Sequence, residues 1–257
     1  HEWNEVIAKL DVWRRLESGK RATREYLTGR YRHDETDPLA AFTLAVVAMN
    51  QRDYATLRDG TTAEALVRAA AEQGFLPARY AIGRAARLSK DITPEQAQKS
   101  LAWLKEAADG GIAGAAGELG FRALKRGDLD AALTWYKRRG ELGDLSVYYY
   151  VARDLSRGAG SWPKDQALAL QWYHLGAERG AEWCISELAE IYRDGQLGVT
   201  PDALKAARFY KRAGEEINVK RLAKSALKRA ARSNDSEAVQ AWLALLPVRS
   251  ELLNMAL

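Results

Sequence analysis

Residue types that commonly carry out chemistry are few in this sequence of 257 residues. There is one cysteine, Cys184, and there are three histidines, His1, His33 and His174. A cysteine thiolate can act as a nucleophile, and cysteine and histidine bind zinc where several recur at short spacings, which they do not here. The glycine-rich stretch GAGSWPKD (residues 158–165) lacks the Lys-Ser or Lys-Thr ending of a phosphate-binding loop. We therefore predict a protein without enzymatic activity, metal site or cofactor.

A repeated spacing is the strongest pattern in the chain. Six aromatic or leucine anchors recur every 32 to 37 residues, at Leu66, Trp103, Trp135, Trp172, Phe209 and Trp242. A glycine follows each of the first four anchors eight residues later, at Gly74, Gly111, Gly143 and Gly180. A period of this size is typical of stacked structural repeats. The chain is therefore predicted to be a tandem-repeat protein.

Each repeat is predicted to contain two helices. After each glycine, small or apolar residues occupy the fourth and eighth positions: Ala78 and Ile82, Ala115 and Leu119, Val147 and Val151, and Cys184 and Leu188. Residues four apart lie on one helical face, so this stripe should be buried, and Cys184 should be a core residue rather than a nucleophile. The ninth position is small in all four repeats, at Gly83, Gly120, Ala152 and Ala189, which predicts close packing of the second helix.

The second helix of each repeat carries start and stop signals. Thr93 and Thr200, each followed by proline, and the acidic residues Asp128 and Asp165 are predicted to begin it. The four glycines should end it in a left-handed conformation. The anchor should fill the space between repeats. His174 takes the position of arginine or lysine in other repeats (Arg68, Lys105, Lys137 and Lys211), so it should lie on a solvated face.

One stretch is similar to a known repeat family. LAEIYRDGQLGVTPDALKAARFYKRAGEE (residues 188–216) resembles the Sel1-like repeat, a relative of the tetratricopeptide repeat, and the resemblance extends over residues 37–246. It implies an all-α fold, a right-handed superhelical solenoid of about six helix pairs with helical caps. Residues 1–36 are predicted to form the N-terminal helical cap, or alternatively a further interaction module, and residues 247–257 a C-terminal tail.

The start of the chain and its longest apolar run bear on location. The sequence begins with His1, so we expect that a signal peptide, a tag or a preceding region has been removed. The longest apolar run, residues 39–49, is about half of the roughly 20 residues that span a bilayer. It fits the first helix of the first repeat, with Ala41 and Ala45 in the buried stripe. We expect no transmembrane segment, and a periplasmic location rather than a cytoplasmic one.

The resemblance also implies where a partner would bind. In tetratricopeptide solenoids the first helix of each pair lines the concave groove. Transfer by position gives Tyr80, Arg84, Arg87, Phe121, Lys125, Tyr149, Arg153, Arg157, Trp183 and Arg193. Most of these residues are basic, so the groove should be positive with aromatic contacts, and salt should weaken binding. The alternative is that the arginines only solvate the helices.

A second basic region spans residues 205–232, with ten lysines and arginines against two glutamates. Lys220, Lys224 and Lys228 are four apart and therefore form one helical stripe. Nucleic acid or anionic lipid could bind such a stripe, but a soluble capping helix would have the same pattern. Because the net charge of the chain is only +5, we favour the capping helix and expect no nucleic-acid partner.

Together these features predict a non-catalytic interaction scaffold that works as a monomer. Its partner would be a protein that is acidic or bears tyrosine and leucine, and the resemblance implies a role in bacterial envelope assembly or secretion. The alternative function is an immunity protein that binds and blocks a secreted phospholipase-type toxin of type VI secretion. A structural factor associated with peptidoglycan or lipid is a third possibility.

Overall fold

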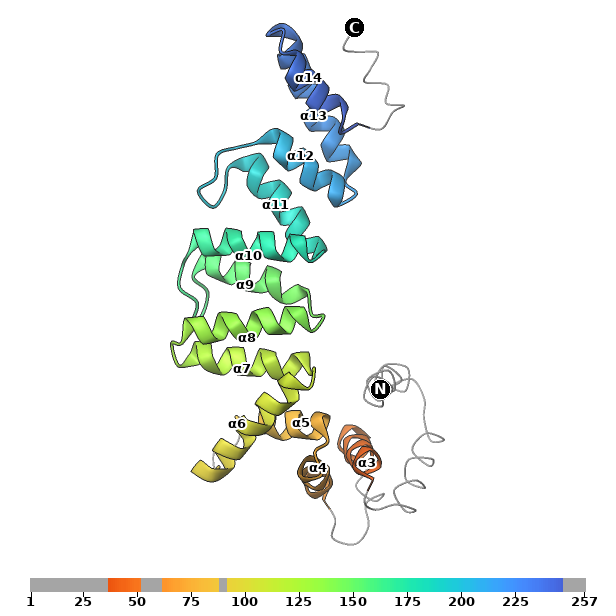
Figure 1. The fold of residues 1–257 in the computed structure, drawn as a ribbon, viewed down its shortest axis with the longest axis vertical. Helices are drawn as coiled ribbons and strands as arrows, with labels where there is room; N and C mark the ends of the chain where they lie inside the picture. The colour runs from red at the N-terminus through yellow and green to blue at the C-terminus, as the bar shows by residue number, and fades with distance from the viewer. Residues whose placement is uncertain (1–36, 52–61, 88–91, 247–257) are drawn as a thin grey trace. The chain divides into compact units, whose positions relative to one another are not determined.

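The computed structural model describes residues 37–51, 62–87 and 92–246, and the regular elements in these ranges are all α-helices, without a strand (Figure 1). The helices are α3 (Pro38–Gln51), α4 (Ala63–Glu72), α5 (Leu76–Ala86), α6 (Pro94–Asp109), α7 (Ala113–Lys125), α8 (Leu129–Glu141), α9 (Ser146–Arg157), α10 (Gln166–Glu178), α11 (Glu182–Asp194), α12 (Ala203–Arg212), α13 (Glu216–Arg232) and α14 (Ser236–Leu243). The prediction of an all-α fold is confirmed. The predicted cap over residues 1–36 and the predicted tail over residues 247–257 lie outside the described ranges.

The helices follow the predicted repeat. Within the described ranges they form six consecutive pairs, from α3–α4 to α13–α14, and each anchor residue lies in the second helix of its pair. The long apolar run forms α3, where Ala41 and Ala45 are buried as predicted. No helix among the described residues is both long enough and apolar enough to cross a bilayer.

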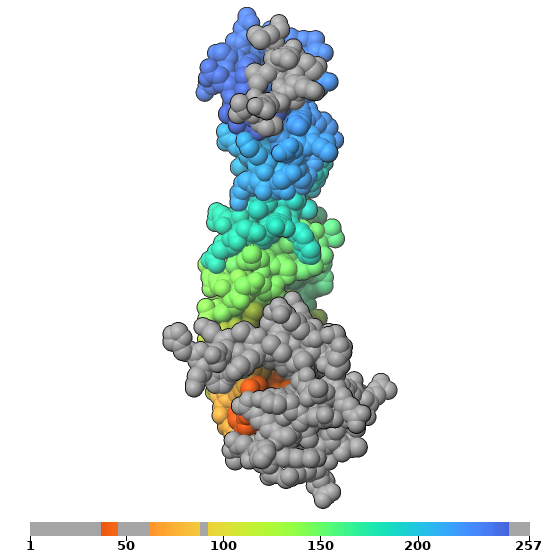
Figure 2. All heavy atoms as spheres, turned by 90° about the vertical axis from the view of Figure 1, so that its right-hand side faces the viewer, coloured from red at the N-terminus to blue at the C-terminus, as the bar shows by residue number. Residues whose placement is uncertain are grey.

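The chain divides into two compact units, residues 1–119 (unit 1) and residues 120–257 (unit 2). In unit 1, α3 packs on α4, α4 on α5, and α5 on α6. In unit 2, each helix from α8 to α14 packs on the next one, and α9 also contacts α11. Figure 2 shows this order at the surface of unit 2, from the green of α8 to the blue of α14. Packing of each helix on its neighbours in sequence is the arrangement of a helical solenoid.

Three second helices begin with the predicted side-chain caps. Asp128 and Asp165 each accept a hydrogen bond from the backbone N–H three residues later, at 3.1 and 2.9 Å. Thr93 forms the predicted capping box with Gln96. The four glycines that follow second helices have φ between 84° and 100°, the left-handed region in which glycine meets no steric penalty. These local signals are confirmed.

The prediction for Thr200 is wrong, because the N-cap of α12 is Asp202. The Asp202 carboxylate accepts a hydrogen bond from the backbone N–H three residues later, at 2.9 Å. Its own N–H donates to the carbonyl of Tyr192 at 2.7 Å, which ties the loop to the end of α11. Asp165 donates in the same way to the carbonyl of Leu155, at 2.9 Å. This tie to the preceding helix, rather than the Thr-Pro pair, places the start of α12.

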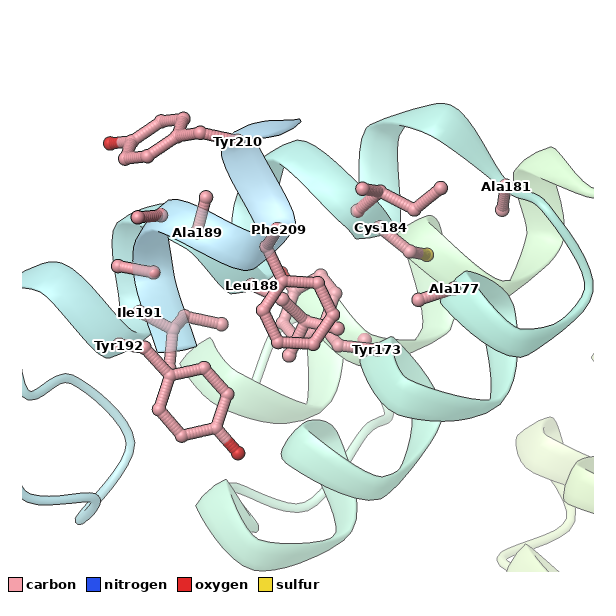
Figure 3. Packing of buried hydrophobic residues seen from close by; sticks show 14 of the residues in the cluster. Tyr173, Ala177, Ala181, Cys184, Leu188, Ala189, Ile191, Tyr192, Phe209 and Tyr210 are labelled. Carbon is pink, nitrogen blue, oxygen red and sulfur yellow. The ribbon is translucent and has the colours of Figure 1, made fainter. Parts of the chain in front are cut away.

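The anchor residues form the core between helices. Five of the six are at most 8% exposed: Leu66, Trp103, Trp172, Phe209 and Trp242. Trp135 departs from the prediction, because it is only half-buried. In unit 2, Tyr173 of α10, Leu188 of α11 and Phe209 of α12 belong to one buried cluster (Figure 3). The repeat spacing therefore reports on a continuous core within this unit.

Small residues allow the paired helices to approach closely, as predicted. A Cβ added at Gly83 would lie 2.4 Å from Leu104 Cγ, and one added at Gly120 would lie 3.1 Å from the Tyr136 ring. A further close approach occurs at Gly176 of α10, which was not singled out from the sequence. Glycine in a helix costs roughly 0.5–1 kcal/mol relative to alanine, and the contacts made possible by the missing side chain offset this cost.

We expect Gly176→Ala to lower the free energy of unfolding by roughly 1–3 kcal/mol, despite the better helix propensity of alanine. The new Cβ would lie 2.4 Å from Cys184 Sγ and 2.7 Å from Tyr148 Cβ. Urea denaturation followed by circular dichroism measures the change. Adding Cys184→Ala should recover part of the loss, because it removes the nearest atom. A Gly176→Ala variant as stable as the parent would show that α10 can move away from α9 and α11 without loss of stability.

Candidate protein-binding face

Two first helices of unit 2, α9 and α11, contact each other and bring three aromatic rings together. Tyr149 and Tyr150 come from α9, and Trp183 comes from the first turn of α11. The ring centroids are 5.6 Å apart for Tyr149 and Tyr150, 5.7 Å for Tyr149 and Trp183, and 6.0 Å for Tyr150 and Trp183. All three pairs meet edge to face, a favourable arrangement of aromatic rings. We call these three residues the aromatic face.

The aromatic face is open to solvent. Trp183 is 56% exposed and Tyr150 is 41% exposed, and the only other exposed large hydrophobic side chain among the described residues is Ile217 of α13. Behind the face, the ring of the buried Tyr173 of α10 packs against the ring of Tyr149, with 6.0 Å between the two centroids. Contiguous exposed apolar side chains on a soluble surface often mark an interaction site. The face is therefore the strongest candidate for a partner site in unit 2.

The local sequence of α9 explains why one ring must be exposed. The run Tyr148, Tyr149 and Tyr150 turns by about 100° per residue along the helix. Tyr148 is fully buried, Tyr149 is half-buried, and Tyr150 points outward. Three consecutive tyrosines cannot all face one core, so part of their apolar surface remains available.

Arg153 is held beside the aromatic face. Its guanidinium carbon lies 5.0 Å from the centroid of the Tyr150 ring, within the range of a cation–π contact. Its Nη2 lies 2.9 Å from Asp154 Oδ1. The hydrogen bond with Asp154 raises the pKa of Arg153 further. The side chain is thus charged, oriented and locally compensated.

Arg193 of α11 belongs to a second ion-pair network. Its Nη2 lies 2.6 Å from Asp194 Oδ2 and also pairs with Glu190. Its Nη1 donates to the Tyr210 hydroxyl at 2.9 Å, and that hydroxyl donates to Glu190. Burial, followed by this hydrogen bond, raises the pKa of Tyr210 to about 12, so the phenol stays protonated at neutral pH. Arg193 fixes the end of α11 and is not an uncompensated cation.

The predicted excess of positive charge is not found on α9 and α11. Arg153 and Arg193 are both paired with carboxylates of their own helices. Arg157 is exposed and makes no ion pair within 4.0 Å of a carboxylate in the described residues. Burial and Glu190 raise the pKa of the half-buried Glu187, and Arg157 opposes that rise, so these charges also interact. The surface is mixed in charge, because acids on α9 and α11 compensate Arg153 and Arg193.

Three predicted residues belong to unit 1 and have different surroundings. Tyr80 is half-buried, and its hydroxyl would be 2.7 Å from a Cβ added at Gly114. Arg84 is exposed on α5. Arg87 Nε lies 3.0 Å from Oε1 of the buried Glu118, so it is tied to α7. A role of these residues in partner binding stays a prediction.

Phe121 and Lys125 lie in the part of α7 that belongs to unit 2. Phe121 is half-buried, and the exposed Lys125 places its Nζ 5.7 Å from the centroid of the Phe121 ring. The pair covers one turn of the helix, and its contribution to a partner site also stays a prediction.

Tyr150 was missed from the sequence, although it is more exposed than Tyr149. Transfer by position selected fixed places after each glycine, and Tyr150 is not one of them. The available signal was the tyrosine triplet, which places aromatic side chains on more than one side of the helix.

Cys184 lies in the core, as its place in the repeat predicts. Its side chain is fully buried, and a Cβ added at Gly176 would collide with its Sγ. Burial, followed by the nearby charge of Glu187, raises the pKa of the Cys184 thiol to about 12. A thiol of that pKa is protonated at neutral pH, whereas a nucleophilic cysteine needs a lowered pKa.

Cys184→Ala is expected to leave partner binding unchanged, because the side chain faces away from solvent and alanine occupies the same place in two other repeats. Stability should fall by no more than about 1–2 kcal/mol, since a single buried sulfur atom is removed. Titration of a captured partner against both proteins measures the affinity. A folded variant that no longer binds would show a role for the thiol itself.

The prediction for His174 is wrong, because the side chain is half-buried rather than solvated. His174 Nε2 lies 2.8 Å from the Tyr192 hydroxyl, and the imidazole packs against Tyr192 and Phe209. Burial and then Lys205 lower the pKa of His174, which favours the neutral imidazole. The lysines at this place in other repeats, Lys105, Lys137 and Lys211, are exposed. The described residues contain no group of three His, Cys, Asp or Glu side chains that could hold a metal ion.

Comparison with known proteins adds family evidence. A family model described as Sel1 repeat matches residues 77–112, 114–144, 146–180 and 184–217, which together exceed half of the chain. The chain is similar to a Sel1 repeat protein from Oxalobacter formigenes, at 24% identity over 82% of this chain and 87% of that one, with a TM-score of 0.46. It is also similar to c5321, a protective antigen of uropathogenic Escherichia coli with an SLR fold, at 22% identity over 86% of this chain and 55% of that one, with a TM-score of 0.38. No curated protein matches the chain.

The four matched segments coincide with the helix pairs from α5–α6 to α11–α12. Of the ten residues predicted from the sequence to line the groove, all except Trp183 fall inside these segments. The predicted resemblance is therefore confirmed, and the family model matches four repeats, between residues 77 and 217, of the predicted span 37–246. The chain belongs to the Sel1 repeat family, whose fold is generally a scaffold for protein–protein interaction and whose members are typically non-catalytic.

Proposed function

We propose that this chain is a non-catalytic scaffold that binds a protein partner through the aromatic face on α9 and α11. The observation that carries this proposal is the contact of Tyr149, Tyr150 and Trp183 on a surface where two of the three rings are strongly exposed. Aromatic side chains are enriched among the residues that dominate binding energy at protein interfaces. They also lose little conformational entropy on binding when they are already held by neighbours.

The surroundings of the face support a protein ligand rather than a small molecule. The rings form an open surface and not an enclosed cavity, and Arg153 and Asp154 flank them with both signs of charge. An apolar centre with a polar rim is the usual anatomy of a protein interface. The partner segment that fits would offer an apolar or aromatic side chain to the rings and mixed polar groups to the rim.

The cellular setting is proposed in two forms. The first is a partner in bacterial envelope assembly or secretion, with this chain acting as a monomer in the periplasm. The second is an immunity function, in which the partner is a secreted phospholipase-type toxin. The identity of the partner separates them, because only the second predicts that the chain inhibits the partner's lipase activity.

The test is capture of the partner from the source organism with the parent chain and with a variant carrying Tyr150→Ala and Trp183→Ala. A variant carrying Arg126→Ala and Lys137→Ala is the control, because it also shortens two exposed side chains of unit 2 but lies outside the aromatic face. The proposal expects a protein that the parent and the control retain and the double variant loses. Equal retention by all three proteins would place the partner site elsewhere.

A further inference from the structure

The outward side of α13 carries a line of exposed cations, and in the described part of the chain only one of them, Lys220, makes an ion pair. Lys220, Lys224 and Lys228 are exposed, with Arg221 and Arg232 beside them. The opposite side of the helix is buried through Val219, Ala223, Ala226, Leu227 and Ala230. Since residues three and four apart share a helical face, the five cations point into one sector of solvent. We call these five residues the α13 basic stripe.

The charges of this stripe are nearly uncompensated, unlike those beside the aromatic face. Among the described residues, its one ion pair joins Lys220 Nζ to Glu216 at 3.9 Å, and both side chains are exposed. The segment 205–232 holds ten lysines and arginines and two glutamates, so it alone exceeds the net charge of +5 carried by the whole chain. Like charges four residues apart destabilise a helix. A bound anion would remove that repulsion, which the fold leaves in place.

One apolar residue lies beside the stripe and favours an anionic lipid surface over a nucleic acid as the ligand. Ile217 is 83% exposed and lies one turn before Lys220 and Arg221 on the same side of α13. An exposed isoleucine adds nothing to binding of a phosphate backbone, and the stripe contains no aromatic side chain on which unpaired bases could stack. At a lipid surface both kinds of group are useful, because the cations meet anionic headgroups and the isoleucine enters the interfacial layer.

We propose that the α13 basic stripe, with Ile217, docks the chain on an anionic lipid bilayer. The geometry fits a flat surface, because the cations point into one sector from a helix whose other side is packed in unit 2. The attraction is electrostatic and falls off within about 10 Å at 0.1 M salt, so it is reversible and sensitive to ionic strength. The aromatic face lies on other helices, α9 and α11, so docking leaves those residues unused.

The test uses the full chain and vesicles of about 30% phosphatidylglycerol in phosphatidylcholine, with pure phosphatidylcholine vesicles for comparison. Cosedimentation gives the partition constant. We expect binding to the anionic vesicles only, with a loss at high salt. The variant with Lys220→Gln, Lys224→Gln and Lys228→Gln should bind about tenfold or more weakly. Ile217→Ser should weaken binding less than the triple change.

A matched variant keeps the result specific. Lys105→Gln, Arg126→Gln and Lys137→Gln remove the same charge from exposed positions outside α13. This control should retain most of the binding, and circular dichroism checks that both triple variants are folded. The proposal is overturned if the two triple variants lose binding equally, or if the chain does not bind anionic vesicles. It is also overturned if a short DNA duplex or a poly-glutamate peptide, added at the same total negative charge as the anionic lipid, displaces the chain from the vesicles.

Discussion

Replacing Trp172 with alanine is expected to lower the free energy of unfolding by roughly 3–5 kcal/mol. Trp172 is 6% exposed, and its indole lies 5.8 Å from the ring of the fully buried Tyr148. It lies on α10, which packs on both α9 and α11, so the cavity would open in the middle of the unit 2 core. Small-domain stabilities are only about 5–15 kcal/mol, so this change should be visible as a large drop in the urea midpoint.

Trp183→Ala provides the matched control for stability. It removes the same side chain eleven positions later, but from a site that is 56% exposed. Substitutions at exposed sites usually change stability by no more than about 0.5 kcal/mol. Chemical denaturation of both variants under one set of conditions gives the comparison. A Trp172→Ala variant as stable as Trp183→Ala would show that the assigned anchor register is wrong.

The same Trp183→Ala variant is expected to weaken partner binding by at least about 2 kcal/mol, which is roughly 30-fold in Kd. The indole is the most exposed ring of the aromatic face, and Tyr149 and Tyr150 hold it edge to face. It is therefore preorganised to bury apolar area against a partner. The loss should appear mainly as faster dissociation, measured by surface plasmon resonance with the captured partner.

The dependence of partner affinity on salt concentration distinguishes the contribution of the aromatic side chains from that of the charged ones. Because Arg153 and Arg193 are compensated within unit 2, affinity should change little between low and moderate ionic strength. Arg157→Glu should slow association modestly, since this arginine is exposed and has no carboxylate of the described residues within 4.0 Å. Steep salt dependence together with an unaffected Trp183→Ala variant would instead support the charged groove predicted from the sequence.

Local patterns in the sequence were sufficient to predict much of the fold. Glycine φ values, the Asp128 and Asp165 caps and the capping box at Thr93 depend on a few adjacent residues, and all of them are confirmed. The prediction of an N-cap at Thr200 was wrong, because the start of α12 is set by a hydrogen bond between Asp202 and Tyr192, ten residues apart. The prediction that His174 is solvated was wrong for a similar reason, since its hydrogen-bond partner, Tyr192, lies on another helix.

The sequence by itself determined the repeat, its helix pairs and the burial of Cys184, because periodic spacing fixes which residues share a helical face. It supplied candidate binding residues by position but not their charge environment. The tertiary structure decided that Tyr150 and Trp183 meet across α9 and α11, and that Arg193 of α11 donates a hydrogen bond to the Tyr210 hydroxyl of α12. Ring contacts and hydrogen bonds of this kind depend on the distance between side chains on different helices. That distance is set by how the helices pack, which no local pattern specifies.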